Sequence, residues 1–116
     1  MFDIDNAMET PLATDALEEV IMGLIINAGQ ARSLAYAALK QAKLGDFAAA
    51  RTMMEQSRMA LSEAHRVQTK LIEDDQGEGK INVSLVLVHA QDHLMNAMLA
   101  RELVTELIDV HEMLNK

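Results

Sequence analysis

The strongest constraint on the fold is a spacing of three and four residues between apolar positions, which is the period of one helix face. It begins after Asp15 and recurs along three long segments. The apolar residues of the first segment are Leu17, Val20, Ile21, Leu24, Ile25, Ala28, Ala31, Leu34, Ala35, Ala38, Leu39 and Ala42. The second segment continues the spacing through Ala49, Ala50, Met53, Met54, the small polar residue Ser57, Ala60, Leu61, Ala64, Val67 and Leu71. The third segment starts at Asn82 or Ser84 and continues to about Leu114, so the spacing predicts helices of about 27, 26 and 32 residues.

Residues that end or begin helices lie between these segments. Asp15 followed three residues later by Glu18 resembles a capping box. Gly45 is placed to end the first helix, and Asp46 to cap the second. The acidic, glycine-containing stretch 73–80 predicts the second connection. Short connections make neighbouring helices antiparallel, so we expect an all-α, up-down-up three-helix bundle.

Composition agrees with a helical fold and excludes several others. Only 3% of the residues are aromatic and there is one proline, which argues against a β-sandwich or barrel. Half of the residues are hydrophobic, so a packed core is expected rather than disorder. There is no cysteine, and hence no disulfide or thiolate site. Residues 1–15, with Pro11, are expected to form a flexible tail, and residues 16–116 the helical domain.

Charge and hydropathy limit the classes of function and the cellular location expected for this protein. The formal net charge of −8 has the wrong sign for a nucleic-acid-binding protein. The first residues are acidic and resemble no signal peptide, and no stretch of 18 residues is free of charged or amide groups. We therefore expect a cytoplasmic protein.

The third segment is unusual because residues 85–88, Leu-Val-Leu-Val, are large and apolar without a break. A helix in a three-helix monomer should have a polar face. We expect this stretch to be covered on one side by the chain's own core and on the other by another subunit. A β-strand over 83–88 is the weaker alternative, since the helical spacing continues to residue 108.

A polar cluster follows directly. At about 100° per residue, His89, Asp92 and His93 share one side of a helix, and Gln91 points the other way. The His-x-x-x-His spacing suits zinc, but the His-Glu-x-x-His order is missing. No histidine has a glutamate three residues before it, so a di-iron site is excluded.

Two interpretations of the cluster remain open at this point. A neutral imidazole can act as a nucleophile and carry a phosphoryl group, which requires mostly positioning and charge stabilisation. A hydrogen-bonded structural cluster without chemistry is an equal alternative. His65 and His111 have charged neighbours, and ordinary solvated roles are expected for both.

The segments Glu18–Ser33 and Val86–Met95, together with Leu44-Gly45-Asp46-Phe47, resemble a known family. It is the IIA component of the lactose/cellobiose/N,N′-diacetylchitobiose class of the phosphoenolpyruvate-dependent sugar phosphotransferase system. The segments are most similar to its N,N′-diacetylchitobiose-specific members. The similarity runs from about residue 16 to the end of the chain.

The resemblance implies a phosphocarrier that accepts a phosphoryl group from phospho-HPr on Nε2 of His89. It would pass the group to the cysteine of a IIB component, for uptake of a disaccharide such as N,N′-diacetylchitobiose. It also implies a homotrimer with the third helices on the threefold axis. Asp92 would hold a divalent cation there, with Mg²⁺ as the expected ion, and Gln91 and His93 would line the phosphorylation site.

Physical reasoning adds to this. Three Asp92 carboxylates on one axis would repel each other, and a hard cation would relieve the repulsion. Because Gln91 points away from His89, we expect it to serve a neighbouring subunit's site. The competing hypotheses are a helical interaction protein without chemistry and, more remotely, a hydrolase with zinc on His89 and His93.

Overall fold

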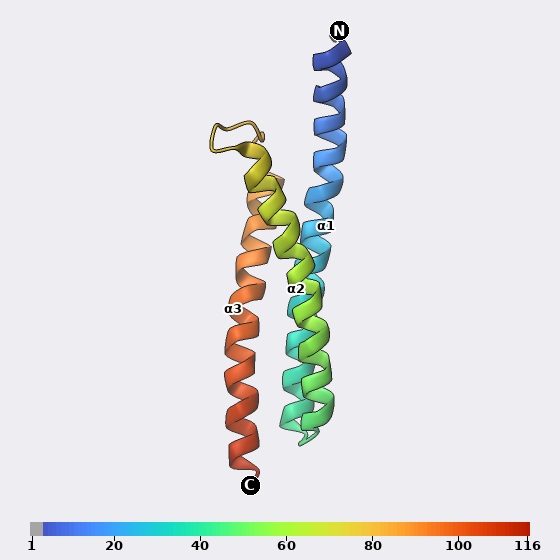
Figure 1. Ribbon diagram of the computed structural model, residues 1–116. Coiled ribbons are helices and arrows are strands. Elements are labelled where there is room, and N and C mark those ends of the chain that lie inside the picture. Colours follow the sequence, from blue (N-terminus) through green and yellow to red (C-terminus); the bar gives the residue numbers. More distant parts are fainter. Residues whose placement is uncertain (1–3) are drawn as a thin grey trace.

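The computed structural model describes the backbone of residues 4–116 and the side chains of residues 16–116. It contains three helices and, within the described range, no strand: α1 spans Ile4–Lys43, α2 Phe47–Asp75 and α3 Leu85–Leu114. The helices lie alongside one another in a molecule of 67 × 21 × 19 Å, with the two chain ends at opposite extremes (Figure 1). The all-α fold class predicted from the sequence is confirmed.

The predicted helix ends are confirmed at both connections. Gly45, two residues after the end of α1, has φ +86°, a conformation that favours glycine. The side chain of Asp46 accepts a hydrogen bond of 3.0 Å from the backbone N–H of Ala49. Ser84 accepts one of 3.2 Å from the N–H of Leu87 and so caps α3. These side chains satisfy N–H groups that have no partner within the first turn of a helix.

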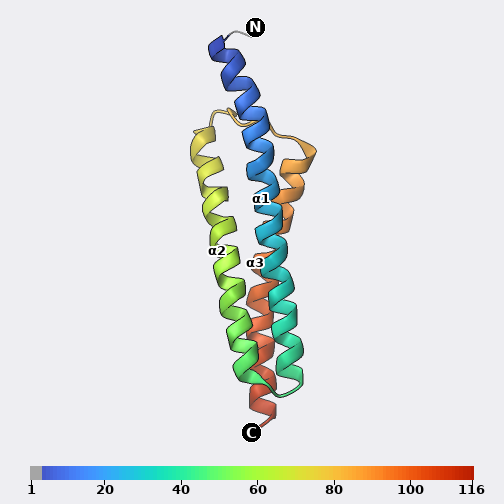
Figure 2. The same cartoon turned by 90° about the vertical axis from the view of Figure 1, so that its right-hand side faces the viewer.

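The start of α1 differs from the prediction. The helix begins at Ile4, well before Asp15, so residues 4–15 of the expected tail are helical. This part of α1 projects beyond the other two helices (Figures 1 and 2). Regular apolar spacing appears only where a helix face packs on a partner, so it gives no signal for residues 4–15, which project beyond the other helices. Residues 1–3 lie outside the described residues, and the domain boundary at residue 15 stays a prediction.

The core lies along α1, which stands between α2 and α3 (Figure 2). One cluster is centred on Leu24 of α1 and Leu94 of α3, and a second on Ala35 of α1 with Val104 and Ile108 of α3. The predicted inner residues of α1 are fully buried alanines at four positions: 28, 31, 35 and 38. Small side chains allow the helix axes to approach closely, which concentrates dispersion contacts along α1.

The opposite face of α3 carries a stripe of apolar side chains at spacings of three and four. These residues, here called the α3 stripe, are Leu85, Val88, Met95, Leu99, Leu103, Leu107 and Val110. Between 45% and 86% of each side chain is exposed. Residues 85–88 form the first turn of α3 and not a strand. Only Leu87 among them is buried. An apolar face of this length, interrupted at Asp92, is typical of an interaction surface.

Among the described residues, no helix is both long and apolar enough to cross a membrane.

Candidate phosphohistidine site

His89 and His93 form the centre of the site, one helical turn apart on α3. Their Nε2 atoms are 3.1 Å apart, within hydrogen-bonding distance. The rings meet edge to face, with centroids 4.5 Å apart and planes at 89°. His89 is exposed and His93 is half-buried. The structure therefore brings together the two histidines that the sequence placed on one helix side.

This geometry limits the proton arrangement of the pair. One Nε2 atom must carry the proton and the other must accept it. When His93 donates, His89 has its own proton on Nδ1 and a lone pair on Nε2. When His89 donates, its own Nε2 carries the proton, which must leave before that nitrogen can form a new bond, and His93 is the acceptor placed to take it up. In both arrangements Nε2 of His93 lies where it can donate a proton to, or accept one from, Nε2 of His89.

A groove of about 490 Å³ adjoins this pair between α1 and α3. His93, Asp92 and Asn96 line it from α3, and Arg32 and Tyr36 from α1. The Arg32 guanidinium lies over the Tyr36 ring, 5.3 Å from its centroid. One cation and one exposed carboxylate thus share the lining of this groove with His93.

Asp92 lies on the α3 stripe, between Val88 and Met95 at the same helical spacing. It is the position at which a charge interrupts an otherwise apolar face. Within the described residues, no group of three or more histidine, aspartate or glutamate side chains could hold a metal ion. Asp92 offers one carboxylate, so a cation there would need ligands from other copies of the chain.

Gln91 lies on the other side of α3, as its position in the sequence predicted. Its amide forms two reciprocal hydrogen bonds with the amide of Gln68 on α2, and both side chains are half-buried. The expected role of Gln91 in a neighbouring subunit's site requires a second chain and stays a prediction.

The other two histidines, His65 and His111, lie far in the sequence from His89 and His93. His65 is exposed on α2, and His111 is half-buried in the last turn of α3. Neither belongs to the hydrogen-bonded pair.

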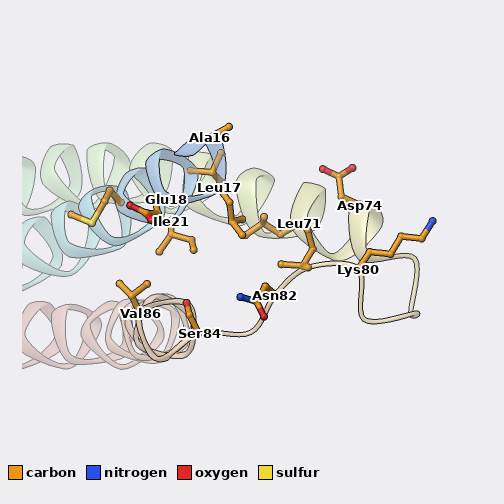
Figure 3. Close-up of a pocket in the computed structure, with 13 residues that line it drawn as sticks. Ala16, Leu17, Glu18, Ile21, Leu71, Asp74, Lys80, Asn82, Ser84 and Val86 are labelled. Carbon is orange, nitrogen blue, oxygen red and sulfur yellow. The ribbon is translucent and has the colours of Figure 1, made fainter. Parts of the chain in front are cut away.

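A larger cavity, of about 940 Å³, lies elsewhere, between the first half of α1, the end of α2 and the start of α3 (Figure 3). Ile21 and Val86 point toward each other across it, while the charged ends of Asp74 and Lys80 point away. No histidine lines it. The larger cavity is therefore separate from the histidine pair.

The sequence interpretation missed Arg32 and Gln68. Arg32 sits on α1 without any motif that would connect it to α3. Gln68 had a recognisable signal, because it is a polar residue at inner spacing between Ala64 and Leu71. A polar side chain at such a position usually has a partner across the helix interface.

Comparison with known proteins shows the family of this chain. Residues 19–112 match the family described as "PTS system, Lactose/Cellobiose specific IIA subunit". The chain belongs to this family. It is therefore a component of a sugar phosphotransferase system, whose IIA components carry phosphoryl groups.

Individual relatives cover nearly the whole chain. The N,N′-diacetylchitobiose-specific EIIA component of Escherichia coli K12 is 75% identical over 114 residues, which is 98% of each chain. The lichenan-specific phosphotransferase enzyme IIA component of Bacillus subtilis is 40% identical and covers 84% of this chain and 89% of its own.

Two solved structures share the fold. One is the solution structure of the IIA(Chitobiose)–HPr complex of the Escherichia coli phosphotransferase system. Its matching chain has a TM-score of 0.77 and 79% identity, covering 86% of this chain and 97% of its own. The other is the cellobiose-specific enzyme IIA of Bacillus anthracis, with a TM-score of 0.81 and 44% identity, covering 84% and 90%.

Proposed function

We propose that His89 is the phosphoryl carrier of this IIA component and that phospho-HPr is its donor. The observation that carries this proposal is that His89 is an exposed residue whose Nε2 lies 3.1 Å from Nε2 of His93, within hydrogen-bonding distance. The relative solved as a complex with HPr supports the choice of donor. The acceptor is the cysteine of a IIB component.

The transfer exchanges one P–N bond for another. Nε2 of His89 attacks phosphorus with its lone pair, the P–N bond of phospho-HPr breaks, and the donor imidazole takes up a proton. When His89 is the donor of the hydrogen bond, His93 accepts the proton that Nε2 of His89 loses; when His93 is the donor, the contact opens and frees the lone pair for attack. The exposed position of His89 allows the in-line approach that phosphoryl transfer requires. In the second step a thiolate of IIB attacks phosphorus, and Nε2 of His89 is the leaving group.

We further propose that three chains assemble as up-down-up bundles, with their α3 helices around a threefold axis. The α3 stripe supports this, because an apolar face more than seven turns long would otherwise remain in water. Three Asp92 carboxylates would then meet, and together they fit a hard divalent cation such as Mg²⁺. A cation there would neutralise their repulsion in the assembled protein.

The substrate proposed for the transport system is N,N′-diacetylchitobiose, with the IIA component acting in the cytoplasm. The 75% identical relative carries that specificity in its name, whereas the relatives at 40% to 45% identity are named for lichenan, cellobiose and galactose.

The experiment is to incubate the protein with phosphoenolpyruvate, enzyme I and HPr. One acid-labile phosphoryl group per chain is expected, and His89→Gln should abolish it. His65→Gln and His111→Gln are matched controls that should retain it. Transfer onward to chitobiose-, cellobiose- and lactose-type IIB proteins then compares the three specificities. Absence of label on the wild-type chain would leave the second candidate, a helical interaction protein that uses the α3 stripe without chemistry.

A further inference from the structure

Gln68 and Gln91 connect α2 to α3 through a reciprocal pair of amide hydrogen bonds. Nε2 of each side chain donates to Oε1 of the other. Each amide thus uses one donor and one acceptor toward the same partner. Such a pair has a narrow range of good geometries, so it fixes the relative position of the two helices where it forms.

The other contacts that hold this part of α3 have no comparable direction. Leu87, Ala90 and Leu94 pack against Ile21 and Leu24 of α1 in one apolar cluster. Apolar packing is non-directional, and packed helices can shift by about 1–2 Å relative to one another. Packing on α1 therefore holds α3 in place without setting its rotation tightly.

The remaining polar links recorded between α2 and α3 lie toward the C-terminal half of α3. Arg101 donates a hydrogen bond of 3.0 Å to the carbonyl of Met54, and Arg51 pairs with Asp109 and Glu112. Within the part of the chain that the structure describes, the glutamine pair is the polar link at the level of the histidines. Gln91 is two residues from His89 on one side and two from His93 on the other.

We propose that Gln68 is a positioning residue for phosphoryl transfer and that it acts through Gln91 of its own chain. The amide pair sets the rotation and height of α3, and thereby the direction in which Nε2 of His89 faces the phosphoryl donor. This inference rests on the proposed function of His89. A displacement of about 1 Å at a reacting atom can lower a rate about a hundredfold. A small shift of α3 is therefore sufficient to slow phosphoryl transfer to His89.

The test is a double-mutant cycle on the rate of phosphorylation by phospho-HPr, with the variants Gln68→Leu, Gln91→Leu and both together. Each single variant should slow the reaction by about tenfold or more, and the double variant should be no slower than the singles. Gln56→Leu, on the exposed side of α2, is the matched control and should leave the rate unchanged. A wild-type rate in Gln68→Leu would overturn the inference, as would slowing by Gln91→Leu alone.

A second readout separates positioning from loss of stability. Imidazole ¹⁵N shifts report which nitrogens carry protons, and in Gln68→Leu those of His89 and His93 should move while those of His65 and His111 do not. Unmoved shifts at His89 and His93 in a folded variant would overturn the inference. If Gln68→Leu does not fold, Q68E/Q91K places an ion pair across the same interface. It should transfer faster than Q91K alone, and equal rates would overturn the inference.

Mixed assemblies decide which chain Gln91 serves. When Gln91→Ala chains are mixed with His89→Ala chains, action within one chain predicts no recovery of rate. Recovery would mean that Gln91 of one chain serves His89 of another, and would overturn the inference while leaving the proposed function intact. A wild-type chain that HPr does not phosphorylate would instead overturn the proposed function.

Discussion

His93 approaches His89 through its Nε2 atom, so the nitrogen proposed to accept the phosphoryl group is the one engaged in the hydrogen bond of 3.1 Å. If His93 is the donor, the hydrogen bond occupies the lone pair on Nε2 of His89, and the bond must open before this nitrogen can bind phosphorus. If His89 is the donor, its Nε2 must first pass its proton to His93. The pair thus connects the protonation of one ring to the reactivity of the other.

The first prediction concerns His93. His93→Ala removes the group that holds the proton near the nucleophile, so phosphorylation of His89 should slow by about ten- to a hundredfold. His93→Gln retains an N–H donor, so it should slow phosphorylation less than His93→Ala does. Rapid-mixing kinetics with labelled phospho-HPr measures both rates. An unchanged rate in His93→Ala would show that the contact has no part in the transfer.

The second prediction concerns assembly. Leu99→Arg places a charge in the centre of the α3 stripe, where 53% of the leucine is exposed in the single chain. If three stripes meet on an axis, the buried guanidinium is unpaired and the trimer should dissociate. Sedimentation velocity would then show monomers. Met59→Arg, at an exposed position on α2, is the control and should remain assembled. A wild-type chain that sediments as a monomer would contradict the trimer.

The third prediction concerns Asp92 and the proposed cation. Asp92→Leu extends the apolar stripe and removes three carboxylates from the axis, so the trimer should persist in a chelator such as EDTA. The wild-type trimer should weaken in EDTA and recover when Mg²⁺ is added. Asp109→Leu, away from the stripe, should behave as the wild type. Sedimentation of Asp92→Leu as a monomer would refute this account.

The fourth prediction concerns stability. Ser57 is fully buried on α2, and its Oγ donates a hydrogen bond of 2.6 Å to the carbonyl of Ala31 on α1. Ser57→Ala should lower the free energy of unfolding by about 1 kcal/mol, because the bond is lost without a large cavity. Urea unfolding monitored by helicity measures the change, with the exposed Ser62→Ala as the control. A difference between the two variants close to zero would contradict the prediction.

Much of the fold was predictable because each helix carries local signals. Asp46, Gly45 and Ser84 mark helix ends through short-range hydrogen bonds and backbone conformation, which depend on few neighbours. The start of α1 was not predictable in this way. A helix that projects beyond its partners has no buried face to impose a pattern, so the start at Ile4 was missed.

The candidate site also has features that local signals predict and features that depend on tertiary contacts. By itself, the sequence determined three helices, the histidines one turn apart on one side of α3, and Gln91 on the other, because helix periodicity fixes relative directions within one element. Only the tertiary structure decided that Nε2 of His93 meets Nε2 of His89, that Gln91 pairs with Gln68, and that Arg32 shares a groove with Asp92. These contacts depend on rotamers and on the relative rotation of packed helices, which the periodicity of a single helix does not specify.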